Sequence, residues 1–197
     1  MKKFLISLIC VFSLITMPVK AEEIELPEVT DHEKVTIYIF RGKGCGFCYN
    51  SLVYFNEIAK DYADYFEVKT YEVWNSQENS ELLAAVASAN EDELGGVPYI
   101  VIGDSYSTVG FLKEWGEEII ETALKEYQNK DYVDLVAEIA KEHPDAEETT
   151  LKEACIEEGI ITQGGEKAAA NDTVIILSIF AVVIVGVTAL VLFSRKK

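Results

Sequence analysis

The stretch Val35-Thr36-Ile37-Tyr38-Ile39-Phe40-Arg41-Gly42-Lys43-Gly44-Cys45-Gly46-Phe47-Cys48 decides the fold, because it joins a strand pattern to a helix pattern through two cysteines. Residues 35–40 alternate between two faces that are both largely apolar, which is typical of a central strand covered on both sides. After Cys48, apolar residues recur in steps of three and four, which mark one face of a helix. This pattern places Cys48 on the inward face of the helix and Cys45 at its N-terminus.

The residues that follow predict alternating strands and helices. We expect a strand at 66–74, a helix at 80–89 capped by Asn79 or Ser80, and a hairpin formed by 99–102 and 106–109. A long amphipathic helix is expected at 112–128. Two shorter helical patterns follow at 132–141 and 149–158, and a short edge strand is expected at 24–26. The order strand-helix-strand-helix-hairpin-helix indicates an α/β domain with a C-terminal helical extension.

Both ends of the chain have the composition of membrane-targeting segments. Residues 1–21 combine a basic start with a short apolar run, which is typical of a secretory signal peptide, and Cys10 would leave with it. Residues 173–194 include an apolar run long enough to span a bilayer, and the basic tail 195–197 predicts a cytoplasmic end. We therefore expect a domain at 22–130, an extension at 131–158, a stalk at 159–172 and one transmembrane helix.

The chain is strongly acidic, with 34 Asp and Glu against 17 Lys and Arg, a formal net charge of −17. Binding to nucleic acid requires clustered cations, so this composition argues against a nucleic-acid partner. A repulsive, solubilising surface explains the charge without any ligand.

Cys45 and Cys48 have three interpretations: a metal clip, a structural bridge or a reactive pair. Zinc needs four ligands, and the chain offers no second closely spaced pair. A bridge closing so short a loop would constrain the unfolded chain little. Redox exchange uses every feature of the placement, because a helix N-terminus favours a thiolate at Cys45 and an inward Cys48 is protected until it resolves a mixed disulfide. We expect positive charge from Lys43 and Arg41 to support the thiolate.

The chain resembles the thioredoxin-like superfamily over about residues 34–128, through Cys45-Gly46-Phe47-Cys48 at a strand-to-helix junction and Val97-Pro98 before the hairpin. The resemblance implies a thioredoxin-like fold with a central mixed sheet flanked by helices and no bound cofactor other than the redox-active disulfide Cys45–Cys48. It also implies that Pro98 is cis and that Val97 binds the backbone of an extended substrate. Gly46 would allow a substrate chain to approach, and Phe47 would give it an apolar contact.

Two positions depart from the family pattern. Many members carry a buried acid six positions before the first cysteine, where this chain has Ile39. Glu33 and Glu72 are weak substitutes as proton acceptors for Cys48. Gly46-Phe47 also differs from the thioredoxin and glutaredoxin dipeptides, which leaves the direction of electron flow open. Cys155 is interpreted as a buried small apolar residue packed on Leu151, with a third reactive thiol as the alternative.

The main hypothesis is a membrane-anchored, extracytoplasmic thiol-disulfide oxidoreductase in which Cys45 attacks and Cys48 resolves. Its partners would be protein thiols and disulfides outside the cytoplasm, together with an electron-transfer partner in the membrane. The basic residues at the two ends favour a bacterial protein. The alternative is a redox-inert binding module or holdase of the same fold, with Cys45 and Cys48 in a permanent bridge.

Overall fold

The computed structural model describes residues 24–30 and 33–164. Its strands are β1 (Val35–Arg41), β2 (Phe66–Glu72), β3 (Tyr99–Ile102), β4 (Tyr106–Val109) and β5 (Thr149–Thr150). Its helices are α2 (Gly46–Ile58), α3 (Gln77–Ala89), the 3-10 turn η2 (Lys113–Trp115), α4 (Gly116–Tyr127), α5 (Leu135–Ala140) and α6 (Leu151–Glu157). The predicted α/β class and the order of the main elements are confirmed.

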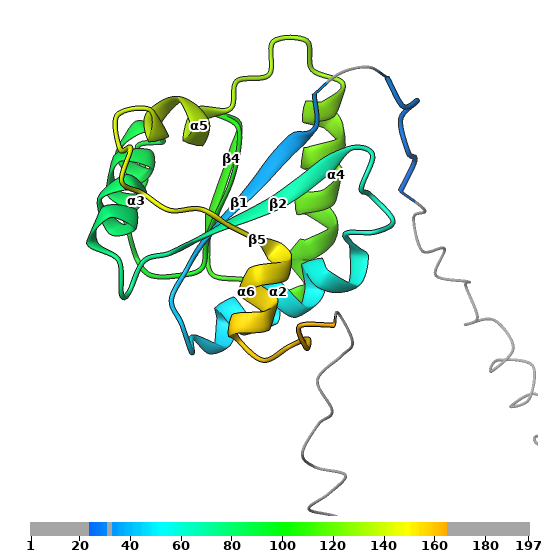
Figure 1. Cartoon of the computed structure of the whole chain (residues 1–197). Coiled ribbons are helices and arrows are strands. Elements are labelled where there is room, and N and C mark those ends of the chain that lie inside the picture. The colour runs from blue at the N-terminus through cyan, green and yellow to red at the C-terminus, as the bar shows by residue number, and fades with distance from the viewer. Residues whose placement is uncertain (1–23, 31–32, 165–197) are drawn as a thin grey trace, which may run out of the picture.

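The five strands form one mixed sheet in the order β4-β3-β1-β2-β5 (Figure 1). β1 runs parallel to β2 and antiparallel to β3, and β3 pairs with β4 as the predicted hairpin. β5 pairs antiparallel with the other edge of β2, where Thr149 lies opposite Thr70. Because β1 is the central strand, its C-terminal end and the cysteine loop that follows lie between the neighbouring strands β3 and β2.

Alternate residues of β1 supply the two sides of the core. Ile37 and Ile39, both fully buried, pack with Phe55 of α2 and with the inner face of α4. Tyr38 and Phe40 face the opposite way and pack against α3 and α5. The helices thus cover both faces of the sheet, as expected for a strand that is apolar on both sides. α6 packs on the outer side of α2 (Figure 1).

Several predicted boundaries were wrong. α3 begins at Gln77, not Ser80, because the side chain of Ser76 caps it by accepting the backbone N–H of Asn79. The predicted helix at 112–128 is divided into η2 and α4, and the helical pattern at 132–141 forms only the short α5. Residues 24–26 form no strand, whereas the first two residues of the predicted last helix form β5.

The predicted signal peptide, transmembrane helix and basic tail lie outside the described residues. Within the described part of the chain, no helix is both long and apolar enough to cross a membrane. The start of the predicted stalk packs on the domain, because Ile160 and Ile161 are buried beside Leu52 and Cys155.

Candidate active site at Cys45 and Cys48

Cys45 caps the N-terminus of α2 with its sulfur. Its backbone is extended, and its Sγ accepts a hydrogen bond from the backbone N–H of Cys48 at 3.2 Å. Ser, Thr, Asp or Asn usually occupies this position, because the first N–H groups of a helix need an acceptor. A sulfur that replaces their oxygen lies where the helix dipole favours negative charge. The arrangement therefore places the Cys45 sulfur at the positive end of the α2 dipole.

Cys48 lies one turn into α2 and is only 1% exposed. Its Sγ accepts a hydrogen bond from the backbone N–H of Gly42 at 3.5 Å. Burial raises the pKa of the Cys48 thiol to about 12, and the neighbouring Cys45 adds to the effect. The two cysteines are thus chemically unequal, as their positions in the sequence predict, and both are free thiols here.

The loop before β3 meets the dithiol. The Val97–Pro98 peptide bond is cis, as the resemblance implies. The Cys45 thiol lies 3.6 Å from the carbonyl oxygen of Val97, to which it can donate. Pro98 is buried, and its carbonyl accepts the backbone N–H of Gly110 at 2.7 Å. The fold therefore brings Val97 and Pro98 beside Cys45 across 52 residues of sequence.

Exposed apolar side chains border a recess beside the first turn of α2, which carries the dithiol. Phe47 is 55% exposed and Leu112 46% exposed, although both are large and apolar. They line a recess of about 270 Å³ together with Tyr49, Val53, Tyr54 and Phe111. Next to it, Gly46 is exposed, and a side chain added there would meet nothing within 4 Å. This surface is open to an approaching chain and offers it apolar contacts.

Trp74 covers the other side of the cysteine loop. A Cβ added to Gly42 would lie 2.1 Å from the Trp74 ring, so the ring occupies the space that a side chain would need. Trp74 is nevertheless 59% exposed. Glycine at position 42 allows the indole to lie directly on the loop, and the backbone N–H of the same glycine contacts Cys48.

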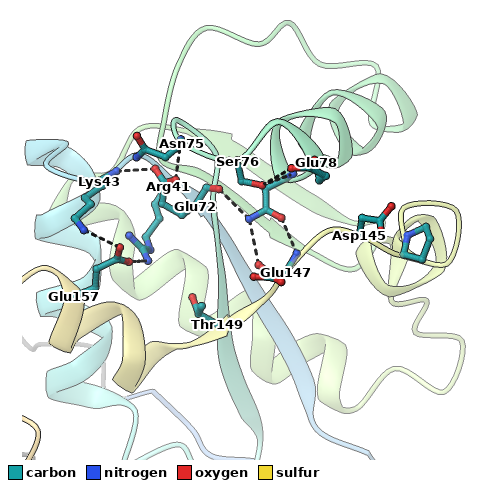
Figure 2. Close-up of a pocket in the computed structure, with 12 residues that line it drawn as sticks. Arg41, Lys43, Glu72, Asn75, Ser76, Glu78, Asp145, Glu147, Thr149 and Glu157 are labelled. Atoms are coloured by element: carbon teal, nitrogen blue, oxygen red, sulfur yellow. Dashed lines mark hydrogen bonds and ion pairs between the residues drawn. The ribbon is translucent and has the colours of Figure 1, made fainter.

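The two cations near the dithiol are held by carboxylates of α6. Arg41 is fully buried, and its guanidinium pairs with both Glu157 and Glu158. The Lys43 ammonium lies 3.1 Å from Glu157 (Figure 2). Lys43 thus has a carboxylate partner in place of a free charge, and its support of a Cys45 thiolate stays a prediction. The sequence did not predict the roles of Glu157 and Glu158, because nothing in the sequence distinguishes them from the other acidic residues.

Glu72, one weak candidate for the missing acid, anchors loops. It accepts the backbone N–H groups of Lys43, Trp74 and Asn75. Burial on its own would raise the pKa of Glu72, but these hydrogen bonds outweigh it and lower the pKa. Ile39, six positions before Cys45, is a fully buried core residue. Glu72 borders a polar cleft of about 870 Å³ that also includes Lys43 and Glu157 (Figure 2).

Cys155 is fully buried between α6 and α2. Its neighbours are Leu52, Ala154, Ile160 and Ile161, and its Sγ lies 3.8 Å from the carbonyl oxygen of Leu52. Burial raises the pKa of the Cys155 thiol to about 11. These contacts agree with its interpretation as a small apolar residue of the core.

Comparisons with known proteins found no family model, no curated protein and no solved structure that matches the chain. Among residues 24–30 and 33–164, no group of three or more His, Cys, Asp and Glu side chains could hold a metal ion.

Proposed function

We propose that the chain is a thiol-disulfide oxidoreductase of thioredoxin-like fold that acts on protein disulfides outside the cytoplasm. The observation that carries the proposal is the inequality of the two thiols at one helix N-terminus. The Cys45 sulfur caps α2 in a side chain that is 9% exposed, and Cys48, one turn later, is only 1% exposed. Exchange needs one reactive thiolate and one protected resolving thiol, and this geometry supports both.

Three further features support the thioredoxin-like fold. The elements follow the order β-α-β-α-β-β-α, β1 and β2 are parallel, and a cis proline precedes β3 beside the dithiol. The proposal that the domain is anchored and extracytoplasmic rests on the sequence of residues 1–21 and 173–194.

In the proposed reaction, the Cys45 thiolate attacks one sulfur of a substrate disulfide. A Cys45–substrate bond forms, the substrate disulfide breaks, and the departing sulfur takes a proton. Cys48 then loses its proton and attacks Cys45 Sγ, which forms the Cys45–Cys48 disulfide and releases the second substrate thiol. Two electrons pass from the dithiol to the substrate. The reverse sequence oxidises a substrate dithiol, and a membrane dithiol–disulfide partner restores the starting state.

The surface around Cys45 supports a protein substrate. The Val97 carbonyl lies beside the attacking sulfur, and an extended peptide could pair with the backbone there as an added strand. Gly46 leaves room for that peptide, and Phe47 offers an apolar contact next to the recess.

Two substitutions test the proposal. Cys45→Ser should abolish exchange with protein disulfides, and Cys48→Ala should trap substrates as mixed disulfides that separate on reduction. The readouts are insulin reduction and non-reducing gels of membranes from cells that express each variant. A redox-inert binding module would keep its partner in the Cys45→Ser variant and would trap nothing in the Cys48→Ala variant. That outcome would refute the oxidoreductase and favour a binding module with a permanent Cys45–Cys48 bridge.

A further inference from the structure

Helix α6, the last helix of the described residues, contacts the loop before Cys45 through two neighbouring carboxylates. Glu157 is the last residue of α6 and Glu158 is its C-cap. The Glu158 carboxylate accepts the backbone N–H of Gly44, the residue before Cys45, at 3.2 Å. It also accepts a hydrogen bond from the Arg41 guanidinium at 3.3 Å. One carboxylate therefore joins the end of β1 to the loop that presents Cys45.

Arg41 completes this connection from inside the domain. Its side chain is fully buried, with Nε donating to Thr70 Oγ1 at 3.1 Å and the two terminal nitrogens directed to Glu157 and Glu158. The next peptide unit supplies the Gly42 N–H that contacts Cys48 Sγ. Figure 2 shows Arg41, Lys43 and Glu157 pointing toward one another at the rim of the polar cleft. The buried cation thus belongs to the residue before the glycine that contacts Cys48, and Glu157 and Glu158 at the end of α6 supply its counter-charges.

The position of the two carboxylates goes against local helix preference. Acidic side chains are disfavoured at a helix C-terminus, where the dipole is negative. A buried arginine is also costly unless it is paired and hydrogen-bonded. The acidic helix end and the buried arginine are each unfavourable alone. Their charges offset each other only when α6 lies against the loop. Such local conflicts resolved by a tertiary contact are expected at functional sites.

We propose that Glu157 and Glu158, by pairing with Arg41, are positioning residues that hold the Cys45 loop and lower the redox potential of the Cys45–Cys48 couple. The effect on the potential rests on the proposed function. The paired carboxylates offset the positive charge of Arg41 at the dithiol. Arg41 lowers the pKa of Cys48 against the larger raising effect of burial, in agreement with a guanidinium close enough to act on that thiol. If one of these carboxylates were neutral, the Arg41 charge would stabilise the cysteine thiolates and hence the reduced form of the couple.

The test compares Glu158→Gln with Glu121→Gln in the full chain in detergent. Both variants lose one negative charge, but Glu121 is exposed on α4. The equilibrium constant of the dithiol with glutathione should move about tenfold toward the dithiol in Glu158→Gln, which is a potential about 30 mV less negative. It should stay within about twofold of wild type in Glu121→Gln. Iodoacetamide should also alkylate Cys45 several-fold faster at neutral pH in Glu158→Gln.

Each outcome decides between the alternatives. Equal equilibrium constants and equal alkylation rates in the two variants would overturn the inference and leave the proposed function intact. A wild-type chain that never equilibrates with glutathione would overturn the proposed function and the effect on the potential, while the alkylation rate still tests the contact with the loop. If circular dichroism shows that Glu158→Gln does not fold, Glu157→Gln removes the other partner of Arg41 and should move both readouts in the same direction.

Discussion

The three described cysteines should differ sharply in their reaction with iodoacetamide at neutral pH, because only the thiolate is alkylated. Burial raises the pKa of Cys48 from its ordinary value of 9.0 to about 12. That change lowers its thiolate population at neutral pH about a thousandfold. The corresponding change for Cys155, to about 11, lowers the thiolate population about a hundredfold. Cys45, which is 9% exposed against 1% for Cys48 and 0% for Cys155, should therefore react first.

The assay is a time course on the reduced full chain, with peptide mass spectrometry to assign each modified cysteine. Raising the pH should increase labelling of Cys48 about tenfold per pH unit, since a thiol with a raised pKa ionises only as the solution approaches that pKa. In urea, Cys45, Cys48 and Cys155 should all react at similar rates, which controls for intrinsic reactivity. Native labelling of Cys48 within tenfold of the Cys45 rate would refute the assignment of an attacking and a protected thiol.

Two further predictions concern stability. Leu52→Ala should reduce the free energy of unfolding by about 2–5 kcal/mol, because Leu52 of α2 is fully buried against α6. As a control, Leu26→Ala at an exposed position should change it by less than about 0.5 kcal/mol. Equal urea midpoints for the two variants would contradict the packing of α6 on α2. Glu72→Gln should destabilise the chain at neutral pH, and the loss should shrink as the pH falls below the ordinary glutamate pKa of 4.5. The reason is that a carboxylate whose pKa is lowered by folding contributes stability only while it is ionised in the native state. A difference in denaturant midpoint between wild type and variant that is independent of pH would show that the carboxylate charge is unimportant.

The sequence predicted those parts of the fold in which local pattern and tertiary environment agree. Residues 35–40 alternate over two apolar faces and form the central strand, and 99–102 and 106–109 form the hairpin at the predicted positions. The start of α3 was placed too late because its first turn is polar, so the apolar periodicity begins after the Ser76 cap. β5 was missed because two residues carry no strand periodicity. Its partner is β2, and Thr149 Oγ1 lies 2.7 Å from Thr70 Oγ1.

The same division applies to the candidate site. The sequence alone determined the spacing of Cys45 and Cys48 and their unequal positions at a helix start, because spacing and periodicity carry that information. The position of Val97-Pro98 beside them was implied by the resemblance to the thioredoxin-like superfamily. Only the tertiary structure decided that Arg41 is buried and that Glu157 and Glu158 are its counter-charges. Glu157 and Glu158 lie 116 and 117 positions after Arg41, and each of the three looks like an ordinary surface charge in the sequence. Their partnership depends on α6 lying against the end of β1, and no periodicity or motif in one chain encodes such a contact.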